Sequence, residues 1–199
     1  MPLFFEKNIS TDTRLGIWKI AEDEAFFRQE VPLHREVSHP HKRLQHLAGR
    51  FLLRHLFPGF PAHLIRIADT RKPYLPNEAY HFSISHCGDF AAAIVSKTHR
   101  VGMDIEIPSE KILRVQQKFM TTDEKNILLP QAVGQFTHIW SAKEAVFKWF
   151  GNGEVDFKQH IRLVGAGADT FDCYFTKTDS QLTIHLHDFD GLCLAYVVA

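Results

Sequence analysis

Val101-Gly102-Met103-Asp104-Ile105-Glu106 is the most informative segment of the chain. Apolar residues alternate with glycine and with acidic residues over 101–107, and a period of two predicts a β-strand. The Asp104 and Glu106 carboxylates should then point to the same side, about 7 Å apart at roughly 3.3 Å per residue. A strand with two acids on one face could simply border water. Gly102 argues against that reading, because glycine in a strand often marks the close approach of a ligand.

A second stretch, Trp140-Ser141-Ala142-Lys143-Glu144-Ala145-Val146-Phe147-Lys148, predicts a helix. Its buried stripe is formed by Ala142, Ala145, Val146, Trp149 and Phe150, which leaves Glu144 and Lys148 together on a different face. Those two could form an ordinary ion pair between residues i and i+4. Together with the acidic strand they instead make three carboxylates and a lysine, which suit a divalent metal that holds a phosphate. Ligands that are all oxygen favour Mg²⁺ or Mn²⁺ over zinc.

Composition limits the classes of protein to which the chain can belong. The 199 residues are 45% hydrophobic and 23% charged with no net charge, which is ordinary for a globular protein and predicts no nucleic-acid partner. No apolar run predicts a membrane span, and residues 1–6 do not resemble a signal peptide. Three cysteines, Cys87, Cys173 and Cys193, are read as free thiols of a cytoplasmic protein. The 13 histidines are scattered and show no Cys/His spacing of a zinc site.

The rest of the chain predicts an α+β protein built from two similar halves. Helices are predicted at 23–27, 42–57, 112–120, 123–129 and 140–150, and strands at 15–20, 81–85, 90–95, 101–107, 159–164, 171–176, 182–187 and 192–198. Each half has a long amphipathic helix and ends in a buried apolar strand. We therefore expect two α+β subdomains, 1–100 and 101–199, related by pseudo-two-fold symmetry.

Several cationic or polar residues could contact phosphate, although each has an ordinary alternative. Arg43, His46, Arg50 and Arg54 follow helical spacing opposite a leucine stripe, where a solvated face is usual. Arg71-Lys72-Pro73 could be a simple turn or could hold a lysine against a phosphate, and Lys143 could be solvated or reach the same group. Ser85 and His86 are better interpreted as phosphate donors than as a hydrolytic pair, because no nucleophile elbow surrounds them.

These motifs resemble those of the Sfp-type 4′-phosphopantetheinyl transferases. The matching segments are Arg71-Lys72-Pro73, Phe82-Ser83-Ile84-Ser85-His86-Cys87, 101–106 and 140–148, in the family order, with a looser match at Phe119-Met120-Thr121-Thr122-Asp123-Glu124. Ser83 and Cys87 depart from the Asn and Ser that the family often has. Both are small polar replacements, so they affect fine contacts more than the activity.

The resemblance implies a reaction and a role for each residue. A serine of an apo acyl or peptidyl carrier protein attacks coenzyme A, takes its 4′-phosphopantetheine and releases 3′,5′-ADP, which is the holo-[acyl-carrier-protein] synthase type of reaction. Asp104, Glu106 and Glu144 would bind Mg²⁺, Glu144 would also be a candidate base, and Lys148 would assist the leaving phosphate. The implied coenzyme A contacts are Lys72, Pro73, Ser85, His86 and Lys143, with Arg43 and Arg50 at the 3′-phosphate.

Two other functions stay open at this point, a coenzyme A-binding module without activity and a Mg²⁺-dependent phosphohydrolase. The carrier, whether from fatty-acid or secondary-metabolite synthesis, would dock on the apolar helical region 112–129. We expect a monomer.

Overall fold

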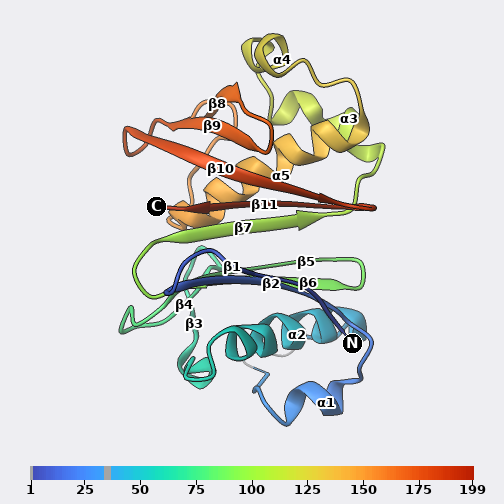
Figure 1. Ribbon diagram of the computed structural model, residues 1–199, viewed down its shortest axis with the longest axis vertical. Coiled ribbons are helices and arrows are strands. Elements are labelled where there is room, and N and C mark those ends of the chain that lie inside the picture. Colours follow the sequence, from blue (N-terminus) through green and yellow to red (C-terminus); the bar gives the residue numbers. More distant parts are fainter. Residues whose placement is uncertain (1, 34–36) are drawn as a thin grey trace. The chain divides into compact units, whose positions relative to one another are not determined.

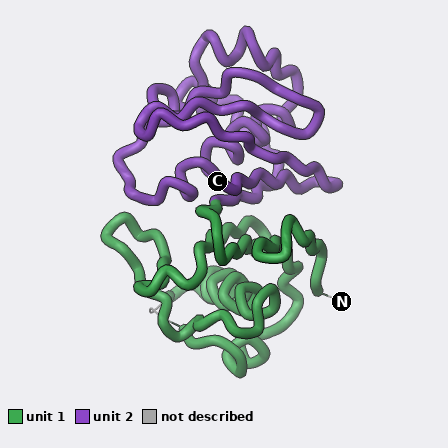
Figure 2. Tube along the Cα trace, turned by 60° about the vertical axis from the view of Figure 1, so that its left-hand side comes forward, with its two compact units in different colours: residues 1–101 green, residues 102–199 purple. Residues whose placement is uncertain are grey.

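The computed structural model describes residues 2–33 and 37–199, which form two compact α+β units. The first unit is Met1–Val101 and the second is Gly102–Ala199 (Figure 2). The mixed α+β class is confirmed, and the symmetry between the halves stays a prediction. No described helix has the length and apolar character that crossing a membrane requires.

The first unit is an antiparallel sheet with a long helix on one face (Figure 1). Its strands run in the order β1-β2-β6-β5, and two short strands, β3 and β4, pair separately. The bounds are β1 Leu3–Asn8, β2 Thr13–Lys19, β3 Arg66–Ile67, β4 Pro73–Tyr74, β5 His81–Cys87 and β6 Phe90–Ser96. The helices are α1 Glu24–Arg28, α2 Pro40–Leu56 and the short 3₁₀ turn η1 Ala62–Leu64.

The leucine stripe of α2 forms the core of this unit. Leu47, Leu52, Leu53 and Leu56 are fully buried against the sheet. Gly49 lets the helix lie close to β5, because a Cβ atom there would come 2.6 Å from a methyl group of Ile84. Asp23 caps α1, since its carboxylate accepts a hydrogen bond from the backbone N–H of Phe26. β1 was missed from the sequence because its half-exposed residues do not alternate regularly.

The second unit is a five-stranded sheet in the order β7-β11-β10-β9-β8, with the long helix α5 packed against β11 and β10 (Figure 1). The strands are β7 Val101–Glu106, β8 Ile161–Ala166, β9 Thr170–Phe175, β10 Ser180–Phe189 and β11 Leu192–Val198. The helices are α3 Lys111–Val115, the 3₁₀ turn η2 Gln116–Lys118, α4 Thr122–Leu128 and α5 Val133–Phe150.

Helix α5 is longer than the sequence predicted, because it begins at Val133 rather than near Trp140. The Gln135 side chain accepts hydrogen bonds from the backbone N–H groups of Gln131 and Ala132, which satisfies donors at the start of the helix. Gly151 ends it in the left-handed conformation, at a φ of 76°. These two ends fix the position of the residues that α5 presents to the edge strand β7.

Candidate active site

Gly102 allows α5 to lie directly against β7. A Cβ atom at this position would come 2.0 Å from the carbonyl oxygen of Ala145 and 2.5 Å from the backbone nitrogen of Trp149. The sequence interpretation, close approach of a ligand, is therefore corrected: the helix backbone itself approaches the strand. This contact brings the 144–148 turn of α5 beside Asp104.

We expect Gly102→Ala to separate α5 from β7. The clash is with backbone atoms that cannot rotate away, so the free energy of unfolding should fall by about 2–3 kcal/mol. Gly134→Ala, in the first turn of α5 with nothing within 4 Å of the added methyl group, is the matched control and should be neutral or slightly stabilising. Urea denaturation of both variants measures the difference, and equal midpoints would contradict this packing role.

Asp104 is buried and paired with Lys148. Its carboxylate is covered by α5 rather than by water, and Oδ1 lies 2.6 Å from the Lys148 ammonium. The alternative that Asp104 merely borders water, which the sequence analysis argued against, is excluded by this burial. The spacing also allows Lys148 to pair with Glu144, one turn earlier on the helix; the 2.6 Å ion pair with Asp104 joins the helix to the strand, and the charge of Lys148 also acts on Glu144.

The charges of Asp104, Glu106, Glu144 and Lys148 act on one another, so the structure brings all four together in the second unit. Burial raises the pKa of Glu144 to about 7; Lys148 opposes this rise, and Asp104 and Glu106 add to it. Burial and the charge of Asp104 likewise raise the pKa of Glu106. When ionised, the three carboxylates outnumber the single Lys148 ammonium, so this partly buried cluster has a net negative charge.

This donor set fits a divalent cation. The oxygens belong to carboxylates only, which Mg²⁺ and Mn²⁺ prefer, and a cation would relieve the repulsion among the carboxylates, which adds to burial in raising both glutamate pKa values. Trp140, one turn before Glu144 on α5, donates a side-chain hydrogen bond to Glu106 and opposes the rise of its pKa. The sequence analysis assigned Trp140 no role at the site, although its position one turn from Glu144 was the available signal.

We expect Mg²⁺ binding to weaken below neutral pH. Glu144 must lose its proton to bind a cation, so with a pKa of about 7 the affinity should fall by about tenfold per pH unit below that value. The same pKa shift also makes the stability of the metal-free protein depend on pH. The folded state holds the Glu144 proton more tightly than the unfolded state does, so the free energy of unfolding should fall as pH rises from about 4.5 to about 7.

Titration calorimetry in buffers of different ionisation enthalpy measures this coupling. Close to one proton should be released per Mg²⁺ at about pH 6 and fewer at about pH 8. In Glu144→Gln the proton release should disappear. Proton release that is identical in wild type and Glu144→Gln would show that Glu144 does not titrate with metal binding.

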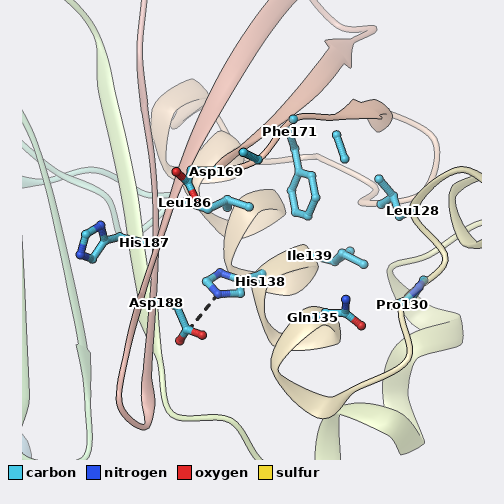
Figure 3. A pocket seen from close by; sticks show the side chains of 13 residues that line it. Leu128, Pro130, Gln135, His138, Ile139, Asp169, Phe171, Leu186, His187 and Asp188 are labelled. Carbon is cyan, nitrogen blue, oxygen red and sulfur yellow. Dashed lines mark ion pairs between the residues drawn. The ribbon is translucent and has the colours of Figure 1, made fainter.

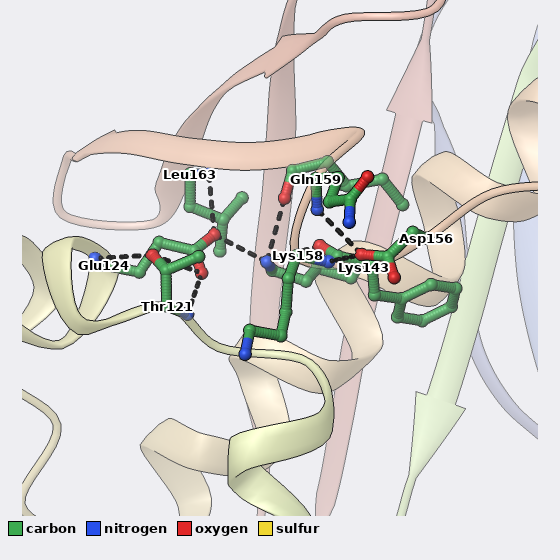
Figure 4. A network of polar contacts seen from close by, with 9 residues as sticks. Thr121, Glu124, Lys143, Asp156, Lys158, Gln159 and Leu163 are labelled. Carbon is green, nitrogen blue, oxygen red and sulfur yellow. Dashed lines mark hydrogen bonds and ion pairs between the residues drawn. The ribbon is translucent and has the colours of Figure 1, made fainter.

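Lys143 is a structural residue, which corrects the prediction that it contacts phosphate. Its side chain is 0% exposed, and its ammonium lies 2.5 Å from the Glu124 carboxylate and donates to the carbonyl oxygens of Phe157 and Ile161 (Figure 4). Glu124 also accepts from the backbone N–H groups of Thr121 and Leu163. The pair therefore joins α4, α5 and the start of β8.

In the first unit, the structure brings His46 of α2 and His86 of β5 together, with ring centroids 5.5 Å apart. Arg50 lies beside them and donates to the carbonyl oxygen of His46, but its side chain is buried rather than on a solvated helix face. Ser85 precedes His86 on β5 and is also buried. Of the predicted phosphate contacts on these elements, His86 is the exposed one.

Arg43, predicted to contact the 3′-phosphate, is held by partners within the first unit. Its guanidinium pairs with Glu24 at 2.7 Å and donates to the carbonyl oxygens of Val37 and Ser38. These bonds connect the Arg43 side chain to α1 and to residues 37–38, which precede α2. This geometry gives no support to a phosphate contact.

Lys72 lies in a cationic environment within the first unit. Burial, and secondarily the charge of Arg100, lowers the pKa of Lys72 to about 8. Burial chiefly lowers the pKa of His81; the charge of Glu78 opposes this, and the charges of Arg100, Lys72 and His99 add to it. Pro73 follows Lys72 at the start of β4, paired with Ile67. A bound anion would relieve this repulsion, so Arg100 and His81 are candidate site residues that the sequence analysis did not identify.

Comparison with known proteins shows which protein family this chain resembles. The model of the 4′-phosphopantetheinyl transferase superfamily matches residues 100–197, which include the whole carboxylate cluster. The chain is 30% identical over 159 residues to 4′-phosphopantetheinyl transferase psf-1 of Bacillus pumilus, covering 74% of this chain and 63% of that protein. It is 34% identical over 115 residues to enterobactin synthase component D of Salmonella austin, covering 56% and 49% respectively.

A third relative, 4′-phosphopantetheinyl transferase AcpT of Escherichia coli O157:H7, is 30% identical over 134 residues, which is 61% of this chain and 68% of AcpT. The matches thus span about half to two thirds of the length of these relatives. With the model match across β7 and α5, these likenesses show that the chain belongs to the 4′-phosphopantetheinyl transferase superfamily.

Proposed function

We propose that the chain transfers the 4′-phosphopantetheine group of coenzyme A to a serine of an apo acyl or peptidyl carrier protein. The observation that carries this proposal is the cluster of Asp104, Glu106, Glu144 and Lys148, which lies inside the region matched by the superfamily model. The cluster supplies oxygen ligands and a cation at one place, and it offers no nucleophile. The nucleophile would come from the carrier.

In the proposed reaction the serine oxygen attacks the β-phosphorus of coenzyme A and forms a new P–O bond. The bond from that phosphorus to the bridging oxygen breaks, and 3′,5′-ADP leaves. Mg²⁺, held by Asp104, Glu106 and Glu144, would neutralise diphosphate charge and orient the attack. Lys148, held by Asp104, would stabilise or protonate the leaving oxygen.

The serine proton needs an acceptor near neutral pH. Glu144 is the proposed acceptor, directly or through water, by the carboxylate oxygen that would not hold the cation. Lys72 and His86, with Ser85, are proposed to hold coenzyme A phosphates, because Lys72 lies in a cationic environment and His86 is exposed.

We place the carrier on the apolar surface that follows β7. A cavity of about 280 Å³ is lined by Glu106, Ile107, Ile112, Val115 and Trp140, so it borders the carboxylate cluster directly. Ile107, Ile127 and Leu129 are exposed. An apolar groove beside the metal ligands would receive a carrier helix and bring its serine to the cluster.

Intact-mass measurement of apo carriers tests the proposal. The chain, coenzyme A, Mg²⁺ and either a fatty-acid or a peptidyl carrier are combined, and the carrier should gain the mass of phosphopantetheine. A chelator should stop the reaction, and a carrier with its serine replaced by alanine should gain nothing. Coenzyme A binding with no mass change on any carrier would favour a module without activity, and phosphate release without a carrier would favour a phosphohydrolase.

A further inference from the structure

His138, Asp188 and Cys193 form a second cluster of potential metal ligands in the second unit. They come from α5, β10 and β11, and one ligand atom from each lies within 4.8 Å of the others. Figure 3 shows the His138 ring facing the Asp188 carboxylate, and Nε2 is 3.9 Å from Oδ1. The donors are a nitrogen, an oxygen and a sulfur, unlike the all-oxygen set of Asp104, Glu106 and Glu144.

Regular elements hold the three residues in place. Asp188 and Cys193 are direct partners across the β10–β11 pairing, so their side chains share one face of the sheet. The turn between these strands is two residues long, and Gly191 adopts a positive φ of 81° in it. Helix α5 covers this face, and the Cys193 thiol lies 4.0 Å from the carbonyl oxygen of Gly134, one turn before His138. The positions of the three residues are thus set by a helix and two paired strands rather than by a long loop.

An ion can reach the cluster from solvent, because one of its three residues is exposed. Cys193 is fully buried, most of His138 is buried, and the Asp188 side chain is 74% exposed. Nδ1 of His138 is buried, and no described residue forms a hydrogen bond with it. His138 and Asp188 also line a cavity of about 350 Å³ together with Gln135, Asp169 and Phe171 (Figure 3). The cavity has room for water beside the cluster.

We propose that His138, Asp188 and Cys193 bind a transition-metal ion of the zinc class, with a fourth coordination position open to this cavity. Imidazole and thiolate select zinc-like ions over Mg²⁺, and three protein ligands with one open position are usual for zinc outside closed structural sites. Thiolate and carboxylate balance the charge of a divalent ion. The Cys193 thiol proton is released to solvent as the metal–sulfur bond forms.

Metal binding requires only a small contraction of the cluster. Ligand atoms of a tetrahedral zinc ion lie roughly 3.3–3.8 Å apart, given bonds of about 2.0–2.3 Å. The three atoms lie within 4.8 Å, so they must approach by about 1 Å, and the exposed Asp188 carboxylate can turn toward the buried pair. The ligands are far apart in the chain, which is why their spacing showed no zinc site in the sequence.

Cobalt substitution tests the proposal with the full chain. Co²⁺ alone is added to chelator-treated protein, and absorbance is recorded. Wild type should develop a cobalt–thiolate charge-transfer band that corresponds to one Co²⁺ at this cluster, and Zn²⁺ should remove the band, whereas a hundredfold excess of Mg²⁺, which occupies the carboxylate cluster, should not. Cys193→Ser should lack the band, and Asp188→Asn should weaken Co²⁺ binding at least tenfold.

Controls separate this site from other groups. Cys87→Ser should keep the band, because Cys87 lies on β5 of the other unit, and Asp104→Asn should keep it, because Asp104 belongs to the carboxylate cluster. Asp188 is exposed, so its variant should fold even if substitution of the buried cysteine unfolds the protein. No band in wild type, a band that survives Cys193→Ser, or affinity unchanged in Asp188→Asn would overturn the proposal.

Discussion

Asp104→Asn is expected to lower the rate of phosphopantetheine transfer by about a thousandfold while the protein stays folded. The amide keeps the shape of the side chain but removes a charged metal ligand and the anionic partner of Lys148 at 2.6 Å. Both the binding of the cation and the orientation of the Lys148 ammonium should therefore suffer. Single-turnover transfer to an apo carrier at saturating coenzyme A measures the loss.

Stability should change little, because two effects oppose one another. The variant breaks a partly buried ion pair, which costs about 1–3 kcal/mol, but it also removes one of three mutually repelling carboxylates. Since Asp104 raises the pKa values of Glu106 and Glu144, the variant should lower both. Asp172→Asn, at an exposed position on β9, is the matched control and should leave transfer unchanged. Near-normal turnover of Asp104→Asn at limiting Mg²⁺ would remove Asp104 from the metal site.

Sequence periodicity predicted most of the elements that build the site. The period of two at β7 and the helical stripe of α5 were visible in the residues, and α5 does pack Ala142, Ala145 and Val146 into the core. Periodicity shows which side chains share a face; it does not show what covers that face. This is why the burial of Asp104 beneath α5 escaped the sequence analysis.

Long-range partners could not be predicted either. Lys143 lies within a helix whose pattern allowed a solvated charge, and only the approach of Glu124 and of two carbonyl oxygens makes a buried position possible for it. His138 and Cys193 are likewise brought together by sheet register and helix packing. In each case the decisive contact joins segments that no local pattern relates.

Lys143→Met is expected to destabilise the second unit strongly, by about 3–5 kcal/mol. Methionine fits an apolar space of similar length but leaves the Glu124 carboxylate without its cation and the Phe157 and Ile161 carbonyls without a donor. For a chain of this length the melting temperature should fall by about 6–20 °C. Lys118→Met, at an exposed position in η2, is the matched control and should change it little.

A double variant separates the buried ion pair from a catalytic role. Glu124→Gln removes the charge and keeps one oxygen, which can accept from the backbone N–H of either Leu163 or Thr121 but not from both, so Lys143→Met with Glu124→Gln should recover part of the lost stability. A phosphate-binding Lys143 predicts a different outcome, in which stability is unchanged and coenzyme A affinity falls. Thermal melts and titration calorimetry on the same samples distinguish the two. Because the ammonium is fully enclosed by protein oxygens, the loss should be in the melting temperature.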